Sequence, residues 1–189
     1  MERGAIFAGF GGQGILFCGH VLAEAALLEG RHVTWMPSYG PEMRGGTASC
    51  TVVISDREIG SPILDRADVV VALNPPSLAR FEPVVTPHGL LVINTSLIEA
   101  EPTRRDIEVL ALPCTGLAAT MGDVRLVSIV ALGGLVATRS LVRPDSVRKA
   151  LRTMLAGKKR EMLDADLAAF ERGYEAAAPI TEMITEVYA

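Results

Sequence analysis

A glycine-rich turn near the start of the chain is the first segment whose residues could do chemistry. Residues 9–14 read GFGGQG, which fits the pattern GxGxxG, between an apolar run at 5–9 and a helical pattern at 13–29. Glycines let the backbone turn sharply and let a ligand approach without obstruction by a Cβ atom. The first N–H groups of the helix carry the positive end of its dipole and suit a phosphate or carboxylate. We therefore expect four residues to turn their backbone toward an anion: Gly11, Gly12, Gln13 and Gly14.

An ordinary NAD(P) or FAD site requires more than this turn. Such sites place an acidic residue about 20 residues further on, at the end of the second strand, where it binds the ribose hydroxyls. In this chain residues 34–37 read TWMP, with neither an acid nor an arginine for a 2′-phosphate. The sequence thus disfavours a dinucleotide dehydrogenase. Two interpretations of the glycine turn remain: it binds an anion of another kind, or its glycines serve only the turn from strand to helix.

The segment 38–47 reads SYGPEMRGGT and displays several functional groups at fixed places. Arg44 is its only strong cation, and a guanidinium can bind a phosphate or carboxylate through two parallel hydrogen bonds. Tyr39 offers a flat apolar face with a polar tip. Because the loop leaves the second predicted strand at the edge where open parallel sheets bind ligands, we expect Ser38, Tyr39, Glu42 and Arg44 to border the glycine turn. The alternative is a plain surface loop with an Arg44–Glu42 contact.

Hydrophobic patterning indicates the elements that must position these residues. Gly30 follows the helical pattern at 13–29 as a C-cap would, and Pro37 is expected to end the second strand. The first 36 residues then form a parallel β-α-β unit. We expect a single α/β domain over 1–189, Rossmann-like and three-layered, with a mostly parallel sheet and a helical C-terminal third that includes a buried helix at 124–138. The expected strands lie at 5–9, 32–36, 48–55, 68–73, 90–94 and 108–112.

Composition excludes several other classes of protein. The chain has 189 residues, 49% of them hydrophobic, and a formal net charge of −4, so disorder and binding to nucleic acid through bulk charge are disfavoured. Its three cysteines, Cys18, Cys50 and Cys114, form no CxxC pair and are expected to be small buried thiols. The histidines do not cluster, so no metal site is expected. No apolar stretch reaches the roughly 18 residues of a membrane span, and we expect a soluble, cytoplasmic protein without membrane contact.

Several segments together resemble the gamma subunit of the 2-oxoacid:ferredoxin oxidoreductases, most closely that of the 2-oxoglutarate enzyme. The resemblance covers nearly the whole chain. It departs where the family usually has asparagine and this chain has Asp123, Ser128 and Asp166. The matching segments are the turn at 9–14, TWMPSYGPEMRGGT at 34–47, CTVVIS at 50–55, IGSP at 59–62, NPPSL at 74–78 and VALG at 130–133.

This resemblance implies one subunit of a complex rather than a complete enzyme. The partners would be alpha and beta subunits that bind thiamine diphosphate and a ferredoxin-like delta subunit. The complex would oxidatively decarboxylate a 2-oxoacid with thiamine diphosphate, Mg and iron–sulfur clusters, deliver the acyl group to coenzyme A and reduce ferredoxin. The chain alone has no cysteine set for a cluster and no GDG segment with paired asparagines for Mg and the diphosphate. We therefore assign no catalytic residue to this chain and expect it to hold no cofactor alone. Its expected task is to place the cofactors of the complex and to provide the electrostatic environment around them.

Other interpretations remain open at the level of sequence. The complex could instead act on pyruvate or indolepyruvate. A free-standing nucleotide-binding protein or a purely structural subunit would also carry a glycine turn. In isolation the chain could form a homodimer through an apolar patch near Trp35 and Tyr39.

Overall fold

A computed structural model describes the backbone of residues 1–38 and 47–188, and the side chains of these residues except 179 and 181–188. The described residues form a sheet flanked by helices, with two short 3-10 turns, η1 (Glu82–Val84) and η2 (Val124–Leu126). The strands are β1 (Glu2–Phe10), β2 (His32–Ser38), β3 (Thr47–Ser55), β4 (Ala67–Ala72), β5 (Val85–Asn94) and β6 (Glu108–Leu112). The helices are α1 (Ile15–Leu28), α2 (Pro75–Phe81), α3 (Cys114–Thr120), α4 (Val127–Thr138), α5 (Pro144–Met154) and α6 (Arg160–Tyr188).

The strands lie in the order β2-β3-β1-β4-β5-β6. The three pairs β1–β4, β4–β5 and β5–β6 are parallel, which confirms the mostly parallel sheet. The expected β-α-β unit needs a correction, because β3 lies between β1 and β2 and runs antiparallel to both. β2 therefore points the same way as β1 without pairing with it. The β1–β3 pairing is long-range in sequence, and the patterns at 5–9 and 32–36 carry no signal for it.

The second strand does not end at Pro37 as expected. β2 continues to Ser38, and Pro37 pairs with Cys50 of β3. Since β2 is an edge strand, it has one side without ladder hydrogen bonds, where the missing N–H of a proline is tolerated. The C-terminus of the helix before β2 follows the prediction. Helix α1 ends at Leu28, and Gly30 adopts the left-handed φ of 76° that a helix C-terminus favours.

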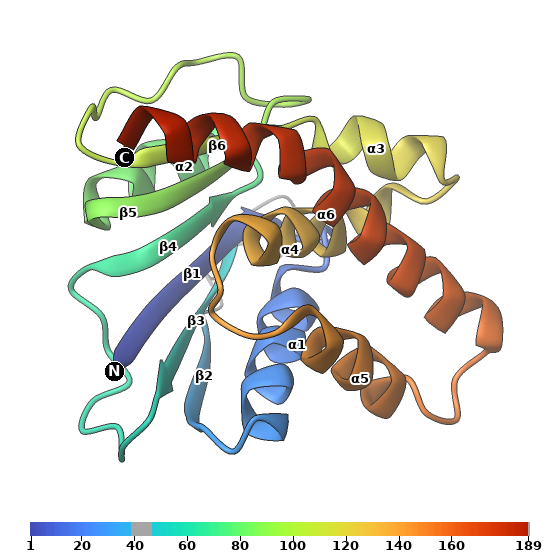
Figure 1. The fold of residues 1–189 in the computed structure, drawn as a ribbon. Helices are drawn as coiled ribbons and strands as arrows, with labels where there is room; N and C mark the ends of the chain where they lie inside the picture. Colours follow the sequence, from blue (N-terminus) through green and yellow to red (C-terminus); the bar gives the residue numbers. More distant parts are fainter. Residues whose placement is uncertain (39–46, 189) are drawn as a thin grey trace.

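Helices cover both faces of the sheet, as the three-layer prediction requires (Figure 1). Helices α1, α4, α5 and α6 lie over one face and share the larger apolar cluster with it. Helix α2 and the connector after β5 cover the other face and share a smaller cluster that includes Leu78, Ile98 and Ile107. The central strand β4 is apolar on both sides because it faces both clusters. No helix among the described residues is both long and apolar enough to cross a membrane.

The buried helix expected at 124–138 is present as η2 followed by α4. Its glycines permit a close crossing with α6. A Cβ atom added at Gly133 would overlap the carbonyl oxygen of Phe170, and one added at Gly173 would overlap the carbonyl oxygen of Val130. The two helix backbones are therefore in direct contact, which offsets the low helix propensity of glycine at this point.

The three cysteines are free and buried, as predicted. Burial raises the pKa of the Cys50 and Cys114 thiols to about 12, and it raises the pKa of the Cys18 thiol as well. The Cys18 thiol donates to the carbonyl of Ser128 at 3.2 Å, so it ties α1 to α4. These thiols act as small packing groups.

Candidate functional site

The glycine turn joins the end of β1 to the start of α1. Its shape is fixed by Gln13, whose amide donates to the Phe10 carbonyl at 3.2 Å and whose side-chain Oε1 accepts from the Phe10 amide at 2.6 Å. Gly12 and Gly14 have φ of 94° and 76°, values that other residues rarely adopt. These two hydrogen bonds engage the backbone N–H and the side-chain Oε1 of Gln13 within the turn. The backbone of Gly11, Gly12 and Gly14 therefore remains to meet a ligand.

Among the described residues, the turn leaves room for a ligand beside Gly12. There a Cβ atom would meet no described atom within 4 Å, whereas one at Gly14 would lie 2.7 Å from the Ser128 hydroxyl. Gly14 is also the N-cap of α1, and no side chain in the described part of the chain caps that end of the helix. Its first N–H groups are therefore available to an anion, and the open space beside Gly12 fits a phosphate or a carboxylate there.

The ends of the 38–47 loop lie at the same edge of the sheet as this turn. Thr47 pairs with Phe10 across β1 and β3, and Ser38 pairs with Ser49 across β2 and β3. Both ends of the loop therefore lie at the edge of the sheet from which the glycine turn leaves. The other expected members of the site lie outside the described residues and stay predictions: Tyr39, Glu42 and Arg44.

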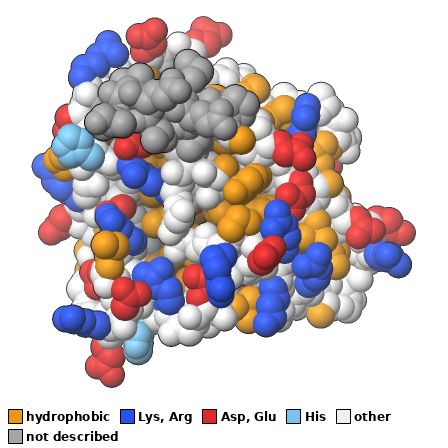
Figure 2. Space-filling model, viewed as in Figure 1, with side chains coloured by type: hydrophobic (Ala, Val, Ile, Leu, Met, Phe, Trp, Pro, Cys, Tyr) orange, Lys and Arg blue, Asp and Glu red, His pale blue; other side chains and the backbone are white. Residues whose placement is uncertain are grey.

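A groove of about 860 Å³ opens beside the glycine turn. Gly12 and Gly14 form part of its wall, together with residues of α1, η2, the end of α5 and the start of α6. Apolar side chains reach the surface on this helical face, among acidic and basic ones (Figure 2). The sequence interpretation missed the groove, because its lining residues come from several separate elements. The apolar lining consists of Phe17, Leu126, Met154, Leu155, Met162 and Ala165.

Two carboxyl groups in this groove have pKa values that are shifted in opposite directions. Asp166 is only 6% exposed, and burial, with a smaller effect of the nearby Asp123, raises its pKa to about 6. Asp123 receives Arg125 Nε at 2.9 Å and Nη2 at 2.7 Å, and these hydrogen bonds lower its pKa to about 2. The groove thus holds one carboxylate matched by a guanidinium and one that takes up a proton near pH 6.

Ser128 is the third place where the chain departs from the resembled family, and it lies behind the glycine turn. Its hydroxyl is buried and has no hydrogen-bond partner among the described residues. It faces the position that a Cβ of Gly14 would occupy. The three departures Asp123, Ser128 and Asp166 therefore gather around one end of α1. No group of three or more metal-binding side chains occurs in the described part of the chain.

A strand–glycine turn–helix at one edge of an α/β sheet, beside an open groove, defines a Rossmann-like domain suited to hold an anionic ligand. Comparison with known families identifies the family to which the chain belongs. The family model described as pyruvate ferredoxin/flavodoxin oxidoreductase matches residues 4–176, and the chain belongs to that family.

Individual relatives confirm the resemblance to the gamma subunit. The chain is 41% identical over 169 residues to ketoisovalerate oxidoreductase subunit VorA of Methanothermobacter thermautotrophicus, covering 89% of this chain but 35% of that protein. It therefore spans about a third of the length of this relative. It is 31% identical over 180 residues to 2-oxoglutarate synthase subunit KorC of Methanocaldococcus jannaschii, covering 94% of this chain and 95% of that one.

Solved structures show the same fold. The gamma subunit of a keto/oxoacid ferredoxin oxidoreductase from Geobacter sulfurreducens superimposes with a TM-score of 0.83 at 27% identity, covering 95% of this chain and 98% of that one. A chain of the 2-oxoglutarate:ferredoxin oxidoreductase from Magnetococcus marinus gives a TM-score of 0.85 at 24% identity, covering 94% of this chain and 31% of that one.

Proposed function

We propose that this chain works as the gamma subunit of a 2-oxoacid:ferredoxin oxidoreductase. The match of the family model over residues 4–176 carries the proposal. Thiamine diphosphate, Mg, iron–sulfur clusters and coenzyme A supply the chemistry when they are bound in the complex. The part of this chain is to bind and position, since its described residues contain no metal-binding group and its thiols are buried.

The proposed contact with a cofactor is the glycine turn together with the 38–47 loop. The uncapped N-terminus of α1 and the open space at Gly12 support a contact with a diphosphate, as found in coenzyme A and in thiamine diphosphate. Arg44 would add a charge clamp from the loop, and Tyr39 and Glu42 would shape the pocket. None of these residues is assigned a role as nucleophile or general base.

The proposed partners are the alpha and beta subunits that bind thiamine diphosphate and a ferredoxin-like delta subunit. The proposed substrate is 2-oxoglutarate, in line with the KorC relative, which matches over 95% of its length. A second candidate is ketoisovalerate, because the VorA relative has 41% identity. Both are 2-oxoacids that differ only in the group beyond the keto carbon, so the proposed role of this chain is the same with either.

The test is an assay of the chain assembled with its partner subunits. We expect ferredoxin reduction that requires a 2-oxoacid, coenzyme A and this chain. Running 2-oxoglutarate and ketoisovalerate side by side decides between the two substrates. No ferredoxin reduction with any 2-oxoacid, or a saturable micromolar increase of NADH fluorescence with the purified chain, would contradict the proposal and favour a free-standing nucleotide-binding protein.

A variant tests the role of Arg44 separately. Loss of a charge-assisted hydrogen bond weakens binding by about tenfold or more, so Arg44→Met should raise the apparent KM for coenzyme A by that factor. The matched control is Arg80→Met, which removes the same charge from an exposed position on α2. If the Arg44 variant keeps both its turnover and its apparent affinity for coenzyme A, the loop is not a charge clamp.

A further inference from the structure

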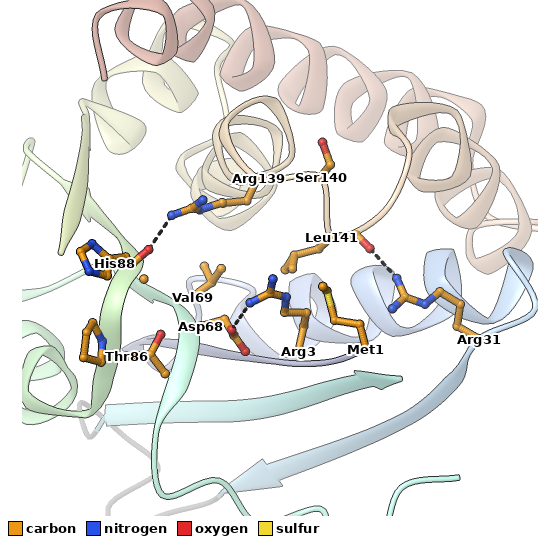
Figure 3. Close-up of a pocket in the computed structure, with 12 residues that line it drawn as sticks. Met1, Arg3, Arg31, Asp68, Val69, Thr86, His88, Arg139, Ser140 and Leu141 are labelled. Atoms are coloured by element: carbon orange, nitrogen blue, oxygen red, sulfur yellow. Dashed lines mark hydrogen bonds and ion pairs between the residues drawn. The ribbon is translucent and has the colours of Figure 1, made fainter. Parts of the chain in front are cut away.

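A second cavity, of about 630 Å³, lies at the opposite edge of the sheet from the glycine turn. It is lined by the amino-terminal parts of β1, β4 and β5 and by the segment that follows α4 (Figure 3). Three arginines line it, Arg3, Arg31 and Arg139, against one acid, Asp68. The sequence gives no hint of this convergence, because the arginines lie far apart along the chain. Nothing in the proposed function uses this edge of the sheet.

Two of the arginines are each held by one acid that does not line the cavity and by one backbone carbonyl that does. Arg31 Nε lies 3.1 Å from Asp56 Oδ1, and its Nη1 donates to the Leu141 carbonyl at 3.2 Å. Asp56 is not one of the residues that line the cavity. The ion pair therefore holds the guanidinium in place without putting its negative charge on the cavity wall.

Arg139 is held in the same manner on the other side of the cavity. Its Nη2 donates to the His88 carbonyl at 2.7 Å and to Glu108 Oε1 at 2.8 Å. Like Asp56, Glu108 does not line the cavity. Figure 3 shows Arg3 between Arg139, which extends toward His88, and Arg31, which extends toward Leu141.

Donors remain available on these side chains. Arg3 Nη1 donates to Asp68 at 2.6 Å, the one side-chain hydrogen bond that Arg3 makes among the described residues. A guanidinium carries five N–H donors in a planar fork, so most of the donors of Arg3 are left for another acceptor. The hydroxyl-bearing side chains of Thr86 and Ser140 line the same cavity and can donate as well.

The wall formed by the start of β5 is rigid. His88 has a left-handed φ of 60°, which is uncommon for a residue other than glycine. Its amide donates to the Asp106 carbonyl at 2.7 Å, and its own carbonyl accepts from Arg139. A backbone held by hydrogen bonds on both its amide and its carbonyl keeps a binding surface in one shape before the ligand binds.

We propose that this cavity binds a multivalent oxyanion through the guanidinium groups of Arg3, Arg31 and Arg139. A phosphoryl group and a polycarboxylate share the required chemistry, which is several oxygen acceptors that match planar N–H forks. The ligand would connect β1 to the segment after α4. The site is independent of the glycine turn, so its ligand is distinct from the cofactor proposed there.

Isothermal titration of the full chain at fixed ionic strength tests this proposal, with pyrophosphate and citrate as probes. We expect a saturable site whose affinity is about tenfold or more weaker in Arg3→Gln and Arg139→Gln. Tighter binding of pyrophosphate identifies a phosphoryl ligand, and tighter binding of citrate identifies a polycarboxylate. Arg3→Lys keeps the charge but loses the fork, and it should also weaken binding, which provides a milder variant if Arg139→Gln fails to fold.

Two control variants distinguish binding in this cavity from binding at the glycine turn and from a general effect of surface charge. Arg80→Gln removes an exposed charge on α2 and should leave the affinity unchanged. Pyrophosphate also suits the glycine turn and Arg44, so it is titrated in the Arg44→Met background as well, where the site that depends on Arg3 and Arg139 should keep its affinity. No saturable binding of either probe overturns the proposal. So does an affinity that falls in Arg44→Met but not in the Arg3 and Arg139 variants, a result that would instead support the proposed contact at the turn.

Discussion

The buried carboxyl of Asp166 should make the stability of the chain depend on pH. Its pKa of about 6 compares with an ordinary value of 3.8. At about 1.4 kcal/mol for each pKa unit, the ionised form is disfavoured in the folded protein by about 3 kcal/mol. Because the folded-state pKa is raised, stability from this group is fully present below its unfolded pKa and is lost as the pH rises through about 6.

Replacing Asp166 by asparagine removes this dependence. Between about pH 4.5 and about pH 7.5, the free energy of unfolding of the wild type should fall by about 2–3 kcal/mol relative to that of Asp166→Asn. Urea melts at several pH values measure this difference. The difference across pH is a sharper measure than the value at one pH, because a buried amide without a partner has its own cost of about 1–3 kcal/mol.

A matched control is Asp164→Asn, two residues earlier on the exposed side of α6. It should follow the wild type across the whole range of pH. Asp123 titrates near pH 2 and therefore stays ionised throughout the experiment. Parallel pH profiles for the wild type and Asp166→Asn would refute the reasoning, since they would mean that the Asp166 carboxyl is not desolvated.

Three further predictions concern the packing of the chain. Gly133→Ala should lower the free energy of unfolding by about 1–3 kcal/mol, because its Cβ would overlap the backbone of α6. Gly60 has open space around it among the described residues, so Gly60→Ala should change this free energy by less than about 0.5 kcal/mol. Denaturant melts compare the two variants. Glu82 is buried, and its Oε1 accepts from the amides of Thr103 and Arg104. Glu82→Ala should therefore destabilise the folded chain by about 1–3 kcal/mol in the same melts. The control Glu99→Ala, at an exposed position, should not. The thiols should resist a thiol-specific reagent in the native state and react in urea, and rapid native labelling would contradict their burial; these are Cys18, Cys50 and Cys114.

The sequence predicted best the elements whose pattern depends on burial alone. The apolar run at 68–73 and the weaker one at 108–112 both correspond to strands, β4 (Ala67–Ala72) and β6 (Glu108–Leu112). The beginning of β5 was missed, because Pro87 and Gly89 interrupt its pattern. Helix α2 was also missed, although a signal for it was present: Asn74 caps the helix by accepting from the Ser77 amide at 2.8 Å, and prolines occupy the first turn.

The candidate site was predictable only where it is local in sequence. The glycine turn and the ends of the loop follow from a contiguous motif, and the structure places them at one edge of the sheet. The groove could not be predicted, because it brings Gly14 and Asp166 together from opposite ends of the chain. The cavity lined by the three arginines is hidden for the same reason. Long-range packing decides both, and one sequence contains no record of which distant residues meet.

The antiparallel strand between β1 and β2 has a consequence for how this protein can be varied. Nine consecutive residue pairs, from Glu2–Ser55 to Phe10–Thr47, fix β3 against β1. A change of length between Ser38 and Thr47 therefore leaves both attachment points in place. The three-strand scaffold of β1, β2 and β3 is set by these strand pairs, so it does not depend on which residues stand at 39–46.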